Sequence, residues 1–513
     1  MLSKVKTCAL IGVEGFDVFV ETDIAGGLPN FNIVGLPAPS VKEARERVRA
    51  AIKNSGFHFP SQRITVNLAP ADLRKDGSAF DLPIAAGILA ATGQIPPDSL
   101  GGKVFVGELS LNGETREIPG VMAIAAFLKE RGESGKALQL ILPRGNAVEA
   151  ALPGGIAVRG VSNLLELAAY LKGELTLEDP EADLDYILAG ERKNSQPDFK
   201  EVKGQLVAKR GLEVAAAGGH NILLTGPPGT GKTMLARRIP SILPSMTLEE
   251  KLEVTKVHSV AGLLPKDKPL LNQRPFRSPH HSATPAGIFG GGRNPRPGEV
   301  SLAHLGVLFM DEFPEYSREV LEGLRQPLED GEMVITRAEI AVRYPSRFML
   351  VASRNPCPCG YFGHPRHMCR CSEAQIRRYR IKSSGPLMDR IDLHVEVPSL
   401  EYNDLESGQK GESSARIRER VETARGLQRE RFKGTAIDCN ASMSHRHLQE
   451  YCPLGKEAKN LLRRAFDSLG LSMRAHDRII KVARTIADLE GKKNIETPHI
   501  AEAIQYRSED RKF

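Results

Sequence analysis

Residues 221–233 read NILLTGPPGTGKT, and this stretch decides the fold of the 513-residue chain. A short apolar strand, expected over residues 222–224, runs into a glycine-rich loop, and a helix is expected over residues 234–239. Glycines let the loop backbone point its N–H groups at phosphate oxygens, and the helix N-terminus adds positive potential. The pattern predicts a phosphate-binding loop made of Gly226, Pro227, Pro228, Gly229, Thr230, Gly231, Lys232 and Thr233.

The same stretch, together with a second one, predicts ATP hydrolysis with Mg²⁺ as cofactor. Lys232 is expected to reach the β- and γ-phosphates of ATP, and the Thr233 hydroxyl to hold Mg²⁺. Farther along, residues 306–310 form an apolar strand that ends in Asp311 and Glu312. Asp311 fits a partner of Mg²⁺, and Glu312 is placed to polarise the attacking water. A strand ending in acids is common by itself, but beside the phosphate loop it indicates an ATPase rather than a mere nucleotide binder.

The rest of the chain divides by pattern into regions around this core. Short apolar strands alternate with helices in the middle of the chain, which is typical of a parallel α/β sheet. The first region mixes strand and helix patterns, an acidic stretch with little apolar periodicity follows it, and the end of the chain is helical. The predicted division is an α+β domain (1–172), a linker (173–200), an α/β ATPase core (201–397) and a C-terminal helical domain (398–513).

Composition excludes several classes of protein. Hydrophobic residues make up 41% and charged residues 26%, which argues against disorder and fibrous architecture. No apolar run approaches the ~18 residues of a membrane span, and the first residues do not resemble a signal peptide. Seven cysteines, an odd number, do not describe a secreted disulfide framework. We therefore expect a cytoplasmic protein without a membrane partner.

A third strand, expected over residues 348–352, carries Asn355 shortly after its end. A strand-end asparagine is more often a turn former, and only its order after the two ATPase motifs favours a role in orienting the lytic water. Arg390 and Arg474 are two further basic candidates, neither of which stands out among 70 lysines and arginines.

Three long strings carry a family resemblance: PHHSATPAGIFGGGRNPRPGEVSLAHLGVLFMDE (279–312), NPCPCG (355–360) and ARTIADL (483–489). They resemble the magnesium chelatase-like branch of the AAA+ ATPases, most closely the bacterial ComM/YifB type, and the resemblance covers essentially the whole chain. It implies a AAA+ core with a helical lid, and a sensor amide at Asn355. It also implies an arginine finger at Arg390, reaching a neighbouring subunit's site, and a lid sensor arginine at Arg474. An in-trans finger makes the expected active form a homo-oligomeric ring, a hexamer by resemblance.

The first domain resembles Lon protease without its catalytic pair. Residues 68–82, LAPADLRKDGSAFDL, resemble the Lon stretch around its serine nucleophile, which a desolvated lysine activates. Aligned without gaps, the serine position falls on Ala79 and the lysine position on Met122. Ser78 is one residue away, but no lysine stands at the paired position, so peptidase activity is not expected. The domain is interpreted as a scaffold or a platform for partners.

Four of the cysteines lie close together in the sequence. Cys357 and Cys359 are followed, after nine residues, by Cys369 and Cys371. Four thiolates suit tetrahedral Zn²⁺, and His364 and His367 are alternative ligands. Because protein ligands would fill all four coordination positions of the ion, its role would be structural: it would hold together an insertion beside the ATP site. The alternative is a group of four reduced thiols, and the Cys-x-Cys spacing is tighter than usual for zinc.

Basic residues between and after the ATPase motifs raise the question of a nucleic-acid partner. The formal net charge of the chain is +7. An insertion rich in Pro, Gly and Arg is expected over residues 274–298, between the first two ATPase motifs. A hairpin that carries Arg337 and Arg343 is expected over residues 332–344, where the residues alternate in character. A basic stretch with one acid, Glu373, contains Arg366, Arg370, Arg377, Arg378, Arg380 and Lys382. Such a surface suits DNA gripped by its backbone, although a solvated face is the plainer alternative. The leading hypothesis is an ATP-driven motor that translocates on DNA or drives branch migration of recombination intermediates; the alternative is a chelatase-like ATPase that remodels a protein partner.

Overall fold

The computed structural model describes residues 2–132, 138–180, 187, 197–265, 268–292, 295–337, 340–364, 366–382, 385–399 and 411–507. They form two compact units. Unit 1 combines Met1–Arg192 with Leu248–Asn272, and unit 2 combines Lys193–Thr247 with Gln273–Phe513. Among the helices of these residues, none has the length and apolar character that crossing a bilayer requires.

Unit 1 is built on a seven-stranded sheet with the order β3-β4-β2-β1-β5-β8-β9. Strands β1 and β2 pair as a long antiparallel hairpin, and buried and exposed residues alternate along much of both, as expected for a strand with one covered face. A short ribbon of β6 (Glu108–Leu109) and β7 (Thr115–Arg116) lies outside this sheet. The sheet strands are β1 (Leu2–Ile11), β2 (Glu14–Ala25), β3 (Asn30–Val34), β4 (Arg63–Ala69), β5 (Lys103–Phe105), β8 (Gln139–Pro143) and β9 (Ala157–Val161).

A central helix fills the core of unit 1. Every residue of α2 (Asp81–Ala91) is buried, which agrees with its nearly uninterrupted apolar sequence, DLPIAAGILAA. By contrast, α1 (Pro39–Asn54) buries only one face, at intervals of three and four residues. The other helices before the linker are α3 (Val121–Gly132), α4 (Ala147–Ala151) and α5 (Leu164–Lys172).

Helix α9 (Leu248–Ala261) also belongs to unit 1, although it follows the phosphate loop in the sequence. The carbonyl of Ser259 accepts a hydrogen bond from the amide of Gly120 (3.0 Å), and its hydroxyl donates to the carboxylate of Glu149 (2.5 Å). Leu270, beyond the helix, packs in a small buried cluster with Met122. A segment inside the range predicted as one ATPase core therefore completes the fold of the first unit.

Unit 2 contains the predicted parallel sheet, which is confirmed. Its five strands have the order β11-β14-β17-β10-β18, and all neighbours are parallel. β10 and β14 are buried along their whole length, as their apolar sequences ILLT and VLFM predict. The strands are β10 (Ile222–Thr225), β11 (Phe276–Arg277), β14 (Val307–Met310), β17 (Met349–Arg354) and β18 (Leu393–Glu396).

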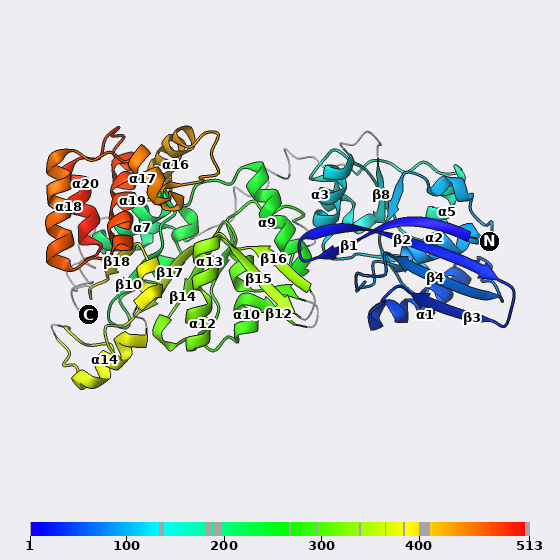
Figure 1. Cartoon of the computed structure of the whole chain (residues 1–513), viewed down its shortest axis with the longest axis horizontal. Coiled ribbons are helices and arrows are strands. Elements are labelled where there is room, and N and C mark those ends of the chain that lie inside the picture. Colours follow the sequence, from blue (N-terminus) through cyan, green and yellow to red (C-terminus); the bar gives the residue numbers. More distant parts are fainter. Residues whose placement is uncertain are drawn as a thin grey trace. The chain divides into compact units, whose positions relative to one another are not determined.

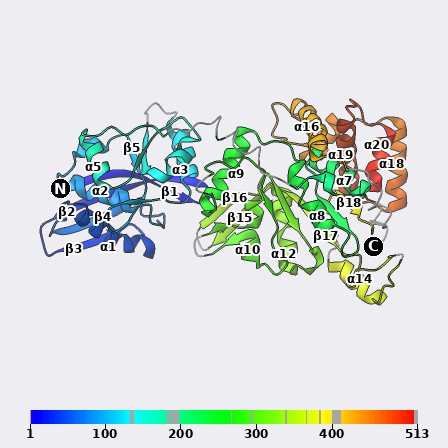
Figure 2. The same cartoon turned by 180° about the vertical axis from the view of Figure 1, so that it is seen from behind.

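Helices and two small hairpins complete unit 2. The C-terminal helices form a cluster, drawn in orange to red in Figures 1 and 2, that shares one hydrophobic core with α7 and the sheet. The hairpin predicted over residues 332–344 is present as β15 (Glu332–Arg337) and β16 (Ile340–Pro345), and a smaller one joins β12 (Gly290–Gly291) to β13 (Arg296–Pro297). The helices are α7 (Leu206–Gly218), α8 (Lys232–Ala236), α10 (Pro285–Phe289), α11 (Glu299–Leu302), α12 (Arg318–Gly323), α13 (Arg325–Asp330), α14 (Glu373–Lys382), α16 (Ser414–Arg431), α17 (His445–Tyr451), α18 (Lys456–Leu469), α19 (Met473–Leu489) and α20 (Thr497–Gln505).

The positions that correspond to the Lon catalytic pair are occupied by non-catalytic side chains. Met122 is buried among apolar residues, so a core side chain stands where a general base would be needed. Ala79 packs against the buried cluster formed with β5 and α3. The hydroxyl of neighbouring Ser78 hydrogen-bonds the Glu108 carboxylate. Unit 1 thus offers no Ser–Lys pair at these positions, which supports its interpretation as a scaffold.

Candidate active site

The phosphate loop, the two acids and the asparagine meet at one edge of the unit 2 sheet. Each follows a different parallel strand: the loop follows β10, Asp311 and Glu312 follow β14, and Asn355 follows β17. The carboxyl ends of parallel strands lie at the same edge, which is where ligands of such sheets bind. Because β17 lies between β10 and β14, its end is placed to touch both other groups.

Lys232 lies buried over the phosphate loop. Its ammonium donates to the carbonyl oxygens of Gly226 and Pro227, both at 2.7 Å, and to the Asn355 Oδ1 at 3.2 Å. Burial lowers the pKa of this ammonium, while the nearby carboxylates of Asp311 and Glu312 oppose the shift. The buried cation is thus held by neutral oxygens, and an anion placed beside it would be stabilised. The structure brings the lysine and the predicted sensor amide into direct contact.

Glycine is required at two places in the loop. Gly231 has a φ of +89° at the start of α8, a left-handed conformation that glycine adopts without strain. At Gly226, a Cβ would lie 2.2 Å from the carbonyl oxygen of Val397, just beyond the end of β18. The phosphate loop therefore packs directly against the residue that follows β18. The first position of the motif requires glycine because there is no room for a side chain, and not because of its backbone angles.

Thr233 and Asp311 form the second contact of the site. The Thr233 hydroxyl donates to the Asp311 Oδ2 at 2.7 Å. Ser353, the penultimate residue of β17, donates its hydroxyl to the other carboxylate oxygen of Asp311. The amide of Glu312 also donates to Asp311 Oδ1, at 3.1 Å. Asp311 is therefore held on both oxygens. Ser353 was not among the predicted site residues, although it stands two positions before Asn355.

Glu312 adopts a left-handed backbone, with a φ of 51°. This conformation costs a non-glycine residue about 1 kcal/mol, and the hydrogen bonds from its amide to Asp311 and to the Ser353 hydroxyl (3.3 Å) hold it in place. Its carboxylate is 55% exposed and lies 3.6 Å from Nδ1 of His281. A carboxylate open to solvent beside the buried lysine suits the activation of water. His281 was missed as an individual residue, although the quoted string 279–312 contains it.

The two predicted arginines lie elsewhere. Asn221, which immediately precedes β10, donates its side-chain amide to the Arg390 carbonyl at 3.0 Å, so Arg390 lies at the edge where the strands begin. Its buried guanidinium pairs with the carboxylate of Glu329. Arg474 is exposed near the start of α19, one turn before Arg478, which pairs with Asp392 at 2.5 Å on the same edge. Arg390 thus lies at the start of the strands, whereas the phosphate loop of its own chain lies at their other end.

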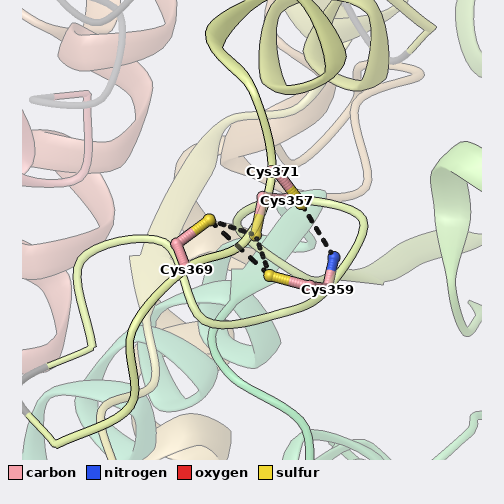
Figure 3. A group of neighbouring side chains, drawn as sticks. All are labelled: Cys357, Cys359, Cys369 and Cys371. Atoms are coloured by element: carbon pink, nitrogen blue, oxygen red, sulfur yellow. Dashed lines mark hydrogen bonds between the residues drawn. The ribbon is translucent and has the colours of Figure 1, made fainter.

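The four clustered cysteines lie on the loop that connects β17 to α14, directly after Asn355. Their sulfur atoms point toward one another (Figure 3), and all lie within 4.8 Å of each other. His364, by contrast, receives hydrogen bonds from loop amides and contacts Ser399, so the described histidines are not part of this group. The structure brings together the four residues predicted as zinc ligands.

The residues at this site fit ATP and Mg²⁺. The buried ammonium, the open loop at Gly229 (where a Cβ would meet nothing within 4 Å) and the start of α8 form a cradle for anionic phosphate. The hydroxyl of Thr233 and the carboxylate of Asp311 are oxygen ligands of the kind that Mg²⁺ prefers. When bound, ATP supplies the phosphoanhydride bond and Mg²⁺ the charge that stabilises the transferred phosphoryl group.

Comparisons with known proteins agree with this site. The family model described as "Magnesium chelatase, subunit ChlI" matches residues 198–405, and models of "Subunit ChlI of Mg-chelatase" and of its C-terminal domain match residues 20–146 and 411–507. Competence protein ComM of Haemophilus influenzae is 44% identical over 511 residues, covering 99% of this chain and 97% of that protein. YifB of Escherichia coli is 43% identical over 511 residues, covering 99% and 98%. The 38 kDa magnesium-chelatase subunit of Rhodobacter capsulatus is 27% identical over 227 residues, 41% of this chain and 57% of that subunit.

The parallel sheet, the phosphate loop and the strand-end acids define an AAA+-type ATPase that uses ATP and Mg²⁺. ComM and YifB each match 99% of this chain, which narrows the class of ATPase further. The chain belongs to the ComM/YifB-type family of magnesium chelatase-like proteins.

Replacing Ser353 tests how the site holds the carboxylate of Asp311. Replacing Ser353 by alanine should lower kcat for ATP by about tenfold, because Asp311 and the strained Glu312 lose a shared partner while the contacts of the phosphate loop remain. Steady-state kinetics and equilibrium ATP binding measure the two effects. Ser346→Ala is the matched control, since the buried Ser346 hydroxyl has no partner among the described residues. An unchanged kcat in Ser353→Ala would remove Ser353 from the site.

Proposed function

We propose that this protein is a ring-forming ATPase that couples ATP hydrolysis to movement along DNA or to branch migration of recombination intermediates. The ATPase class comes from the site; the DNA substrate is the proposal. Support comes from the close relative in Haemophilus influenzae, which is named a competence protein, and from the basic surface described next. The predicted cytoplasmic location belongs to the same proposal.

The observation that carries the proposal is a basic surface directly after the sensor position. In the loop and in α14, the side chains of five basic residues are exposed, and Glu373 is the acid that accompanies them in the first turn of the helix. Basic side chains with few exposed aromatics among them suit a phosphate backbone that is bound without contacts to the bases. Phe362 is an exposed aromatic of this loop, and its ring lies 5.0 Å from the Arg380 guanidinium. The exposed basic residues of this surface are Arg366, Arg370, Arg377, Arg378 and Lys382.

This surface is connected to the ATP site. The hydroxyl of Tyr379, which is buried on the inner face of α14, lies beside the backbone of Asn355. Lys382 lies 3.8 Å from Glu315, just after β14. A nucleotide-dependent movement of Asn355 would therefore be transmitted to the helix that carries Arg377 and Arg378. Such a link is what an ATP-driven motor requires between its nucleotide site and its track.

The β15–β16 hairpin is the second proposed contact. Arg343 is 65% exposed and pairs with Glu332 across the two strands at 3.0 Å. An exposed pair of this kind contributes little to stability, so it can open to a phosphate at small cost. The side chain of Arg337 lies outside the described residues.

The position of Arg390 supports a ring, proposed to be a hexamer. It lies at the sheet edge opposite the phosphate loop, so as an arginine finger it would serve the site of a neighbouring subunit. Arg474, exposed near the same edge, is proposed as the lid sensor arginine of such an interface.

A second candidate function is a chelatase-like ATPase that remodels a protein partner. The observation in its favour is the similarity to the 38 kDa magnesium-chelatase subunit of Rhodobacter capsulatus. That similarity spans 41% of this chain, whereas the similarity to the competence protein ComM of Haemophilus influenzae spans 99%. The first function is therefore preferred.

ATPase rates separate the two functions. We expect turnover by the assembled full-length protein to rise when single strands, duplex or a four-way junction are added, with the largest increase for its physiological substrate. Equal rates with and without every DNA, together with no DNA binding at low salt in the presence of ATP, would reject the DNA motor and favour the protein-remodelling function.

The salt dependence of DNA binding tests the basic surface itself. Duplex affinity should fall with a log–log slope of about −0.9 per phosphate contact. Replacing Arg337, Arg343, Arg377 and Arg378 together by alanine should flatten the slope by up to about four contacts, measured by anisotropy across a salt series. Replacing the exposed Arg463 and Arg464 on α18 is the control and should leave the slope unchanged. An unchanged slope in the fourfold variant would move the DNA contact to another surface, such as residues 416–433.

A further inference from the structure

The four cysteines between β17 and α14 are arranged as the ligands of a single metal ion would be. The Cys357 sulfur lies 3.4 Å from that of Cys359 and 3.7 Å from that of Cys369, and the Cys359 and Cys369 sulfurs are 3.6 Å apart. Zinc bound by four thiolates at about 2.3 Å places neighbouring sulfurs about 3.8 Å apart. A disulfide would bring two sulfurs to about 2.05 Å. An iron–sulfur cluster would spread them farther, because iron and sulfide ions lie between the ligands.

Backbone N–H groups support the sulfurs. The amide of Cys359 donates to the Cys371 sulfur at 3.4 Å, and the amide of Phe362 donates to the Cys357 sulfur at 3.3 Å. Donors aimed at the sulfurs stabilise their thiolate form, and such outer partners orient metal ligands. The Cys357 side chain is fully buried. With four protein ligands, the site is closed to a reacting water and suits a structural ion.

The same loop touches the phosphate loop. A Cβ built on Gly360 would lie 2.6 Å from Cδ of Pro228, and Gly360 has a φ of +84°, so the bare backbone of the cysteine loop packs against the nucleotide-binding loop. The amide of Gly360 donates to the carbonyl of Cys357 at 2.9 Å, which ties this contact to one of the four cysteines. The position of the cysteine loop therefore limits where Pro228 can lie.

The loop also adjoins the sensor amide. Asn355 stands two residues before Cys357, and its Oδ1 accepts a hydrogen bond from Lys232 at 3.2 Å. Its backbone lies beside the hydroxyl of Tyr379, which follows the cysteines in the sequence. Asn355 therefore lies beside both the start of the cysteine loop and the helix that follows it, α14. Within this segment the Arg380 guanidinium lies 5.0 Å from the centroid of the Phe362 ring, and thiol hydrogen bonds join three of the sulfurs. An ion bound by all four sulfurs would add a constraint directly beside Gly360.

We propose that Cys357, Cys359, Cys369 and Cys371 bind one Zn²⁺, and that this ion holds Gly360 against Pro228 so that the phosphate loop keeps its nucleotide-binding shape. Zinc is then a requirement for nucleotide affinity, and not only for the stability of an insertion. This inference rests on the ATP site but not on DNA as the substrate.

Metal content is the first test. Full-length protein purified without chelators should contain about one zinc per chain by mass spectrometry of metals. Cys357→Ser combined with Cys369→Ser should lose the zinc, whereas Cys439→Ser, at a buried cysteine of unit 2 outside the cluster, should keep it. Wild-type protein without zinc, or a double variant that retains it, would reject the metal site.

Nucleotide binding is the second test and needs no DNA. Titration with a fluorescent ATP analogue should show affinity reduced at least about tenfold when zinc is removed from the wild-type protein, and restored when zinc is returned. Gly360→Ala should weaken binding with the zinc content intact, because the added methyl group would push on Pro228. Gly363→Ala is the matched control, since it has a similar φ, +76°, but would meet nothing within 4 Å. Equal affinity with and without zinc, or in Gly360→Ala and Gly363→Ala, would overturn the proposed link.

Discussion

Lys232→Ala is expected to lower ATP turnover by at least about 10³-fold and to weaken ATP binding. The buried ammonium is the cation that the structure holds over the phosphate loop, with neutral oxygens of Gly226, Pro227 and Asn355 as its partners. Its removal leaves the phosphates without a positive partner in a site of low dielectric constant, where charge interactions are strong. Phosphate release under saturating ATP, together with equilibrium binding, measures both effects.

Glu312→Gln separates hydrolysis from binding at the same site. It should retain ATP affinity within about threefold while turnover falls by 10²–10⁴-fold, because an amide cannot accept the proton of the attacking water. Glu319→Gln, at an exposed position of α12 without an assigned role in the site, is the control and should turn over normally. Wild-type turnover by either Lys232→Ala or Glu312→Gln would refute the site assignment.

Arg390→Ala is expected to leave the nucleotide affinity of a single subunit nearly intact while reducing hydrolysis by about 10³–10⁵-fold. The reason is positional. Arg390 lies at the strand-start edge of its own sheet, where Asn221 holds its carbonyl, so its guanidinium can stabilise phosphoryl transfer only in a neighbouring subunit. Mixing Arg390→Ala with Lys232→Ala protein should restore part of the activity, because some interfaces then combine an intact site with an intact finger.

Glu329→Gln distinguishes this catalytic role from a structural one. In the described subunit the guanidinium of Arg390 pairs with the half-exposed carboxylate of Glu329. If the arginine acts only through this pair, Glu329→Gln should lose as much activity as Arg390→Ala. We expect it instead to hydrolyse ATP within about threefold of wild type. Normal hydrolysis by Arg390→Ala, or no recovery on mixing, would exclude an arginine finger at this position.

Much of the site could be predicted because its chemistry lies in short contiguous stretches. The phosphate loop, its strand and its helix are read from residues 221–233, and the two acids from the strand that precedes them. Parallel strands deliver their ends to one edge, so the contacts of Lys232 with Asn355 and of Thr233 with Asp311 follow from strand order. The clustering of Cys357, Cys359, Cys369 and Cys371 was likewise indicated by their spacing in the sequence.

Contacts between distant segments could not be read in the same way. Ser353 resembles any strand serine until β14 and β17 are placed side by side and its hydroxyl meets Asp311. His281 reaches Glu312 from a loop whose composition indicates only turns. The amphipathic pattern of α9 predicts a helix but not the surface that covers it, and its contacts with Gly120 and Glu149 assign it to unit 1.

The sequence by itself determined the parallel α/β core, the nucleotide chemistry and the family. Periodicity and motif spacing extend over only a few residues, so they can be recognised without knowing how the chain packs. The tertiary structure alone decided that Arg390 lies at the edge opposite its own phosphate loop, that Gly360 packs on Pro228, and that Met122 is a core residue. Each of these depends on which surfaces pack together. Close packing is a property of the assembled chain, in which residues far apart in sequence compete for the same space.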